Sequence, residues 1–448
     1  MKLDQPSHRV RAFPVALYLI LATTYLFAIP TGESPDEPSH LQCIEQVARD
    51  SRIPVIDPQP QGDVWWARER IISGLVCAHM PLYYFMTGYT LQITGALLGQ
   101  SVHFEFPPNN PVWADGQSPA MFTHASRATF FELDAPATLT LLRVESILLG
   151  LTTLWSAAVV ARRLAPESPR APPIAMMLAG GWPQFLFMSR AINNDVLAVA
   201  LSVSAFAVLL DSGQPRRYIA VTALTALAIL SKFTMVFTAI AVVLVYFLEA
   251  APRERRSAYV TAGLISLFLF SALGALILLQ PTLRANLEWT RATMAGIDPR
   301  AGSVAYWLDV AIVTLQSGWA RFGWMSVLTP DALAYAWWAL LGFSGTIGAL
   351  ALWRRPAGHE TRFRLLLCAI WAAALIASYV SINVNRFQPQ FRYIFPVIPL
   401  LAGLAAAGIT TALKRHEGWQ RRAAPLLGLL LLAANLWLIF AIVAPAYA

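Results

Sequence analysis

The chain has 448 residues, of which 57% are hydrophobic and only 13% are charged. This composition is too apolar for a soluble globular protein and indicates an integral membrane protein. The net charge of +8 does not point to a nucleic-acid partner, because the basic residues are dispersed over short loops rather than gathered into one patch.

Apolar stretches of about 17 to 23 residues recur along the chain, the length that a hydrocarbon core of about 30 Å requires. The first stretch is long for a signal peptide and lacks a clear cleavage site, so we interpret it as a retained span. We therefore expect an all-α membrane bundle that forms a single domain over residues 1–448, without a separate soluble domain. Hydropathy predicts about eleven spans, over residues 12–30, 137–161, 172–189, 195–211, 218–231, 233–249, 258–280, 332–353, 365–383, 393–413 and 424–446.

Every second connection between these spans is rich in arginine and lysine, which is typical of cytoplasmic loops. This pattern predicts a cytoplasmic N-terminus and an external C-terminus. It also predicts that two further apolar segments, 80–99 and about 304–320, stay at the outer surface. If either one alone crossed the membrane, the later basic loops would lie on the outer side. If these segments also crossed, the bundle would have about 12 or 13 spans. The basic connections contain Arg162, Arg163 and Arg170; Arg216 and Arg217; Arg253, Arg255 and Arg256; Arg354, Arg355, Arg362 and Arg364; and Lys414, Arg415, Arg421 and Arg422.

Two large connections lie on the predicted outer side, 31–136 and 281–331. Binding and catalysis are often carried by such loops on a rigid scaffold, so we expect the functional site there. Cys43 and Cys77 share the first loop and can pair outside the cytoplasm, but their spacing does not decide whether they do.

Directly after the first span, Asp36, Glu37 and His40 begin an amphipathic stretch that we expect to lie as a helix on the outer membrane surface. Ser34 followed by Glu37 also matches a capping box with Pro35 at the first helical position, so these residues can serve only to begin the helix. Alternatively, Asp36 and His40 share one helix face beside a second acid, where they can hold a cation or provide a general base. The residues alone favour neither interpretation.

Residues 36–40, Asp-Glu-Pro-Ser-His, resemble the D-E-x-x-(H/R) arrangement of the GT-C superfamily of polyprenyl-phosphate-dependent glycosyltransferases, which includes protein mannosyltransferases and aminoarabinose transferases. Similar motifs follow in the same order and on the same predicted side. These further motifs are His79–Tyr84, Leu142–Ser146, Pro183–Phe185, Ala191–Asp195, Leu230–Lys232, Arg321–Trp324 and Gln390–Pro396. The last two of them resemble, in particular, motifs of a bacterial family of multispanning membrane proteins of unassigned function.

The resemblance implies a GT-C-like bundle with Asp36 as general base and Glu37 and Asp195 as further catalytic acids. Other interpretations stay open for some residues: Asn194 or Asp195 can cap a helix, Lys232 can snorkel at a span end, and Arg392 can anchor the interface. The residues implied to bind the substrate or its phosphate are His40, His79, Tyr83, Arg143, Asn194, Lys232, Arg321, Gln390, Arg392 and Tyr393.

The implied reaction is an inverting transfer of a sugar from a polyprenyl-phosphate donor to a hydroxyl of a glycan, lipid or protein, at the outer face of the bacterial plasma membrane. Some members of the superfamily need a divalent metal. The resemblance therefore leaves open whether Asp36 and Asp195 hold Mg²⁺ or Mn²⁺. The first rival is a lipid-linked polysaccharide polymerase or ligase, which the early acidic pair disfavours. The second is a lipid or solute transporter, disfavoured because the spans carry few charges and show no paired halves.

Overall fold

The computed structural model describes residues 8–53, 76–113, 115–125, 129–211, 214–250, 256–293, 296–354 and 359–447. Of the predicted features, the basic residues Arg253, Arg255 and Arg355 and the part of the first loop from 54 to 75 lie outside the described residues.

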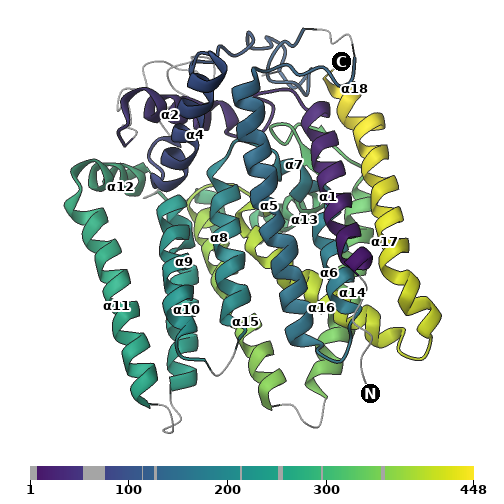
Figure 1. The fold of residues 1–448 in the computed structure, drawn as a ribbon. Coiled ribbons are helices and arrows are strands. Elements are labelled where there is room, and N and C mark those ends of the chain that lie inside the picture. Colours follow the sequence, from purple (N-terminus) through teal and green to yellow (C-terminus); the bar gives the residue numbers. More distant parts are fainter. Residues whose placement is uncertain are drawn as a thin grey trace.

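The fold is an all-α membrane bundle, as predicted, in which the long helices run side by side (Figure 1). Within the described part of the chain, seven helices are long and apolar enough to cross a membrane, three of them together with the short helices that adjoin them. These are α5 (Ala137–Leu164), η2 (Phe233–Met235) with α10 (Val236–Ala250), α11 (Arg256–Leu279), α14 (Asp331–Trp353), α15 (His359–Asn385), η5 (Phe391–Val397) with α16 (Ile398–Ala412), and α17 (Glu417–Leu438) with η6 (Ile439–Val443) and α18 (Ala444–Ala446).

The other predicted spans correspond to helices outside this set: α1 (His8–Ala28), whose apolar part is Ala12–Ala28, α6 (Ala171–Gly180) followed by α7 (Pro183–Ser189), α8 (Asn194–Leu209) and α9 (Arg217–Ser231). Helices α7 and α8 are bent by 116° relative to each other across the turn at 190–193. The turn therefore reverses the chain and places the start of α8 at one end of the bundle.

Close contact between α14 and α16 depends on glycine. A Cβ on Gly408 would overlap the backbone at Ser344, and a Cβ on Gly348 would overlap the backbone at Leu404. Small residues allow membrane helices to approach until their backbones touch, which increases van der Waals contact. Helix α16 is thereby held firmly at the centre of the bundle, directly after the segment that carries Arg392.

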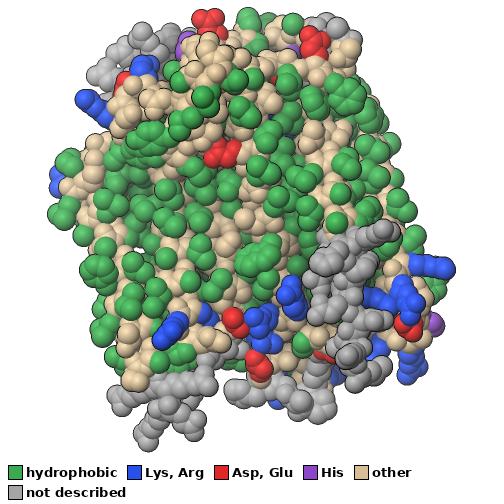
Figure 2. All heavy atoms as spheres, viewed as in Figure 1, with side chains coloured by type: hydrophobic (Ala, Val, Ile, Leu, Met, Phe, Trp, Pro, Cys, Tyr) green, Lys and Arg blue, Asp and Glu red, His purple; other side chains and the backbone are tan. Residues whose placement is uncertain are grey.

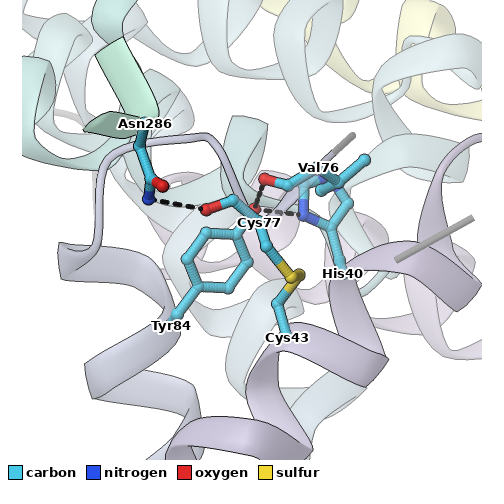
Figure 3. Close-up of a disulfide and its surroundings, with 6 residues drawn as sticks. All are labelled: His40, Cys43, Val76, Cys77, Tyr84 and Asn286. Carbon is cyan, nitrogen blue, oxygen red and sulfur yellow. Dashed lines mark hydrogen bonds between the residues drawn. A yellow bond between two sulfur atoms is a disulfide. The ribbon is translucent and has the colours of Figure 1, made fainter. Parts of the chain in front are cut away.

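At the end of the bundle where the chain leaves α1, two helices lie together outside the array of long helices (Figure 1). These are α2 (Glu37–Asp50) and α4 (Leu82–Leu98), which pack against each other. Cys43 of α2 forms a disulfide with Cys77 in the segment that leads into α4, with Cα atoms 5.6 Å apart (Figure 3). Asn286 Nδ2 donates to the Cys77 carbonyl at 3.3 Å and brings α12 (Pro281–Thr293) against this pair.

The segments 80–99 and 304–320 do not have the length and apolar character of spans. The first forms α4, packed on α2. The second forms α13 (Val304–Trp319), which packs against α14, α7 and η5. Between η4 (Pro299–Gly302) and α14, this second large connection also contains an antiparallel pair of short strands, β1 (Arg321–Phe322) and β2 (Val327–Leu328).

Charged side chains are distributed unevenly along the bundle. Figure 2 shows a broad apolar belt across the middle and a concentration of lysine and arginine at the end opposite to α2 and α4. This matches the basic connections read from the sequence, which join the helices at that end.

The disulfide can be tested by counting free thiols. In the denatured chain without reductant, we expect a maleimide reagent to label one cysteine, Cys368, and after reduction to label all three. Replacing both Cys43 and Cys77 by serine should lower the free energy of unfolding by about 2–4 kcal/mol, since the bond closes a loop in the unfolded chain. Intact mass after labelling gives the count; three labels without reductant would contradict the bond.

A candidate active site beside the first loop

Asp36 occupies the turn between α1 and α2. Its backbone adopts φ 65° and ψ 0°, a left-handed conformation that is uncommon for residues other than glycine, asparagine and aspartate. Its side chain is 38% exposed and makes no capping hydrogen bond to the helix. The carboxylate is therefore directed to other side chains rather than to the start of α2.

Ser34 and Glu37 do not form the capping box that their spacing allows. Ser34 Oγ instead accepts a hydrogen bond from Arg190 Nη2 at 2.5 Å. The Glu37 carboxylate turns away from the helix start and accepts from Arg143. The interpretation of these residues as no more than a helix start is therefore wrong.

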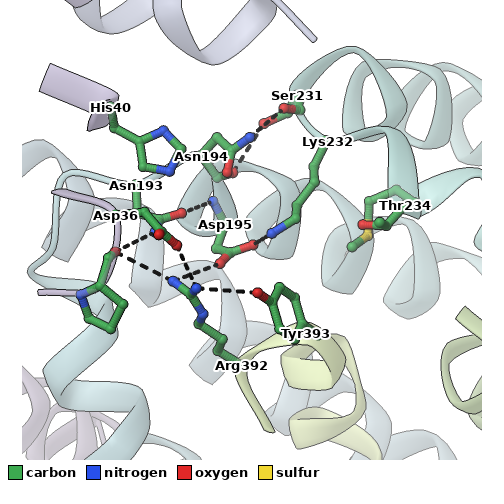
Figure 4. A network of polar contacts seen from close by, with 12 residues as sticks. Asp36, His40, Asn193, Asn194, Asp195, Ser231, Lys232, Thr234, Arg392 and Tyr393 are labelled. Atoms are coloured by element: carbon green, nitrogen blue, oxygen red, sulfur yellow. Dashed lines mark hydrogen bonds and ion pairs between the residues drawn. The ribbon is translucent and has the colours of Figure 1, made fainter. Parts of the chain in front are cut away.

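Arg392, from η5, joins Asp36 to the rest of the site (Figure 4). Its Nη2 donates to Asp36 Oδ2 at 2.5 Å, and its Nη1 lies 3.9 Å from Asp195 Oδ2. Nη1 also donates to the Pro35 carbonyl at 3.4 Å. The Arg392 side chain is only 4% exposed, so it is not an interfacial anchor, and little water screens its interaction with the two carboxylates.

Lys232 lies on the other side of Asp195 and forms an ion pair with Asp195 Oδ1. Its Nζ is 4.9 Å from the centre of the Tyr393 ring, and the Arg392 guanidinium is 5.1 Å from the same ring. The ring face attracts both cations. Because the Lys232 side chain is only 7% exposed, it does not snorkel to the interface as the alternative interpretation assumed.

The turn between α7 and α8 brings Asp195 to this place. Asn193 caps α8, since its Oδ1 accepts from the Asp195 backbone N at 2.8 Å, and its Nδ2 donates to the Pro35 carbonyl at 3.2 Å. Asn194 Nδ2 donates to the Ser231 carbonyl at 3.2 Å, beside Lys232. Asn193 therefore caps this helix in place of Asn194 or Asp195, the two residues of the alternative interpretation, and the Asp195 carboxylate is left for ion pairing.

Two histidines border this network on the side of α2 and α4. Tyr84 Oη donates to the Val76 carbonyl at 3.0 Å and lies 3.0 Å from His40 Nδ1. Since the Tyr84 proton is used by Val76, His40 Nδ1 acts as the donor and Nε2 keeps a free lone pair. The rings of His79 and Tyr83 each lie 6.2 Å from the His40 ring, the first stacked and the second edge-on.

The surroundings fix the charge states of these groups. Desolvation raises the pKa of the Asp36 carboxyl, but the charges of Arg392 and Lys232 outweigh it and hold that pKa below its usual range. Burial, followed by the charge of Lys232, lowers the pKa of His79 to about 4, and burial also lowers the pKa of His40 well below its ordinary value. At neutral pH, Asp36 is therefore ionised and both histidines are neutral.

Glu37 belongs to a separate, fully buried cluster. Arg143 donates to both its oxygens, at 3.1 and 3.0 Å, and the backbone N atoms of Gly32 and Ile192 each donate at 3.1 Å. Arg143 also donates to the Pro30 carbonyl at 3.2 Å. A buried arginine in an apolar bundle needs such a carboxylate partner, and both side chains are occupied by structural contacts.

Arg321 and Gln390 lie outside the network of Asp36 and its partners. Among the described residues, Arg321 forms no hydrogen bond or ion pair with that network. Gln390 Nε2 donates to Gln388 Oε1 at 3.2 Å, and this oxygen also accepts from Tyr393 Oη at 3.3 Å. The Tyr393 backbone N also donates to the Gln390 carbonyl at 3.3 Å, so Gln390 borders the site through Tyr393 and Gln388.

The structure does not favour a metal between Asp36 and Asp195. Both carboxylates face Arg392, and Asp195 also binds Lys232, so a divalent cation would lie directly beside two positive charges. The described part of the chain contains no group of three or more histidine, cysteine, aspartate or glutamate side chains arranged to hold a metal.

Three residues of this region do not appear among the predicted site residues: Tyr84, Arg190 and Asn193. Tyr84 and Asn193 orient His40 and Asp195. The motifs His79–Tyr84 and Ala191–Asp195 already included the first and the last of these three residues. For Arg190 the signal is its place as a basic residue in a predicted external turn, where lysine and arginine are less common. Its guanidinium is fully buried over the Phe187 ring.

A family model described as predicted membrane protein (DUF2142) matches residues 119–401. This chain belongs to that family. The matched residues include Asp195, Lys232 and Arg392, whereas Asp36 lies before them. No curated protein matches the sequence.

Solved structures of GT-C membrane proteins share the fold of this DUF2142 protein. ArnT from Cupriavidus metallidurans bound to undecaprenyl phosphate superposes with a TM-score of 0.54 at 16% identity, over 99% of this chain and 74% of that one. The same ArnT in the apo state gives 0.51 at 15%, over 97% and 73%. The Archaeoglobus fulgidus oligosaccharyltransferase, in a complex with Zn and sulfate, gives 0.52 at 14%, over 96% of this chain and 53% of its own length. The predicted GT-C-like fold is confirmed.

The two adjacent acids should respond differently to loss of charge. Glu37→Gln should lower the free energy of unfolding by about 3–5 kcal/mol, because it leaves Arg143 buried without its counter-charge. Asp36→Asn should cost much less, since Asp36 is partly exposed and Arg392 keeps Asp195. Thermal unfolding of the two purified variants measures the difference. Equal destabilisation of the two variants would contradict the different burial and pairing of the two carboxylates.

Proposed function

We propose that this protein transfers a sugar from a polyprenyl-phosphate donor to an acceptor hydroxyl, with inversion at the anomeric carbon and Asp36 as the general base. The acceptor oxygen attacks the anomeric carbon, its proton passes to Asp36, and the bond from that carbon to the phosphate oxygen breaks. The polyprenyl phosphate leaves with the electron pair. The GT-C fold and the undecaprenyl phosphate bound to the similar ArnT support this class of donor.

The position of Asp36 carries the proposal. Its partners Arg392, Lys232 and Asp195 are almost fully buried, and Asp36 is the member of the network whose carboxylate is substantially open to the surroundings. An ionised carboxylate at an accessible edge, held in place by a buried guanidinium, can accept a proton from a hydroxyl that reaches it.

The charge balance of the network suits this reaction. Asp36 and Asp195 carry two negative charges against the two positive charges of Lys232 and Arg392, and the bordering histidines are neutral. When Asp36 takes the acceptor proton, its own charge disappears while the leaving phosphate gains one. Arg392 and Lys232 can then stabilise the phosphate in place of the carboxylate, without a large movement of the protein.

We place this site at the external face of a bacterial plasma membrane, with the N-terminus in the cytoplasm and the C-terminus outside. The basic loops support this orientation, because lysine and arginine gather at the end of the bundle away from Asp36 (Figure 2). Helix α1 runs toward the end of the bundle that carries Asp36, and α18 lies at that same end (Figure 1), as the proposal requires. A donor anchored by its lipid would reach Asp36 from the membrane edge, and a glycan, lipid or protein acceptor would reach it from the outside.

Asp36→Asn should abolish transfer, because the amide cannot accept the acceptor's proton at neutral pH. The variant should still fold, since the Asp36 side chain is partly exposed. The assay incubates purified protein with a panel of undecaprenyl-phosphate sugars and an envelope extract as acceptor source, and measures release of free undecaprenyl phosphate. Asp50→Asn, an exposed acid at the other end of α2, is the matched control and should retain full turnover. Turnover of the Asp36→Asn protein within about tenfold of the unmodified rate would rule out the general-base assignment.

Removal of divalent metal gives a second test. Because the two candidate carboxylates already face Arg392 and Lys232, we expect turnover to persist after exhaustive chelation with EDTA. The rate is compared before chelation, after it, and after return of Mg²⁺ or Mn²⁺. A rate that is lost on chelation and restored by either ion would instead assign Asp36 and Asp195 as metal ligands.

A further inference from the structure

A second charged site lies at the opposite end of the bundle, away from Asp36. There a half-open cavity of about 520 Å³ is formed between α5, α8 and α15. Figure 2 shows basic and acidic side chains close together at the lower end of the molecule. Nothing in the proposed transfer reaction uses these groups. The charged side chains of the cavity are Arg162, Arg163, Asp211, Glu360 and Arg364.

The positive charges of this cavity are only weakly neutralised. Arg163 pairs with Asp211 at 3.0 Å and Arg364 with Glu360 at 2.6 Å, but the two carboxylates are 45% and 63% exposed. Exposed carboxylates are strongly hydrated and form weak ion pairs. Among the described residues, Arg162 forms no ion pair, so three guanidinium groups face two hydrated carboxylates.

Arg364 is held in a fixed position in the wall of this cavity. Its side chain is only 10% exposed, and Nη1 donates to the Arg163 carbonyl at 2.8 Å, which fixes the guanidinium against α5. Its Nε is buried without a hydrogen-bond partner among the described residues. A fixed, partly unsatisfied guanidinium in a poorly hydrated place favours the approach of an anion.

The cavity continues into an apolar surface along α5. Trp155, Val159 and Arg162 are spaced four and three residues apart, so they share one helix face. Seven residues of helix cover about 10 Å, so the arginine lies at headgroup depth if the tryptophan lies against the acyl chains. Trp155 is 48% exposed, and Val208 of α8 completes this wall.

We propose that this cavity binds the phosphate group of an anionic phospholipid, with the phosphate at Arg162 and Arg364 and an acyl chain along Trp155. Basic pockets between membrane helices recognise acidic headgroups in this way, and the apolar wall distinguishes a lipid from free phosphate. This binding site does not depend on the proposed transferase activity, because it lies at the other end of the molecule.

The test measures binding of dioleoylphosphatidylglycerol to the full chain in detergent by native mass spectrometry. Arg162→Gln should weaken binding about fivefold, the effect expected for one arginine near an acidic headgroup. Arg162 is exposed, so its replacement leaves the contacts of Arg364 intact. The matched control is Arg354→Gln, an exposed arginine at the C-terminal end of α14 outside the cavity, which should leave binding unchanged.

Further measurements identify the ligand. Trp155→Ala should weaken binding of the dioleoyl lipid but not of inorganic phosphate, and dioleoylphosphatidylcholine should bind more weakly than the acidic lipid. Equal binding of the two lipids, or equal losses in the Arg162→Gln and Arg354→Gln proteins, would overturn the proposal. Displacement of the lipid by inorganic phosphate at comparable concentration would overturn the lipid assignment in favour of free phosphate.

Discussion

The buried carboxylate of Glu37 is the interaction on which the arrangement of the candidate site depends. It accepts hydrogen bonds from Arg143 on α5, from Gly32 after α1 and from Ile192 in the turn between α7 and α8. A buried carboxylate without such partners would cost several kcal/mol, so the three segments must stay together around it. Glu37 is also the first residue of α2. The end of α1, the start of α2 and the start of α8 are therefore held in fixed positions relative to one another.

This constraint explains why two neighbouring acids have different surroundings. With Glu37 fixed inside the protein, the chain one residue earlier turns through a left-handed conformation, and Asp36 faces Arg392 instead. Glu37 has lost almost all contact with water, whereas Asp36 keeps an accessible edge. A carboxylate surrounded by four donors is poorly suited to proton transfer, while one held mainly by a single guanidinium can still receive a hydroxyl. The positioning role thus belongs to Glu37, and the chemical role that we propose belongs to Asp36.

The sequence predicted the bundle well because the relevant signals are local. The length of each apolar stretch and the arginines in alternate connections locate the helices without any knowledge of their partners. Asp36, Asp195, Lys232 and Arg392 were all predicted as site residues, and they form one network. The spacing of Ser34 and Glu37 was misleading, because a capping box is a local pattern and the partners that replaced it, Arg190 and Arg143, are more than a hundred residues away.

Pairings across long sequence distances could not be read in the same way. The resemblance implied that Arg143 binds the substrate or its phosphate and did not identify Glu37 as its partner. Nothing in the order of residues 193–195 shows which of them caps α8. The Cys43–Cys77 bond was one of two open outcomes. Its consequence extends into the site, because it holds the segment whose Val76 carbonyl accepts the Tyr84 proton. Tyr84 then requires His40 to donate through Nδ1, which leaves the Nε2 lone pair free. A disulfide persists in an oxidising compartment, so its contribution to the order of this site agrees with the external face that we propose for Asp36.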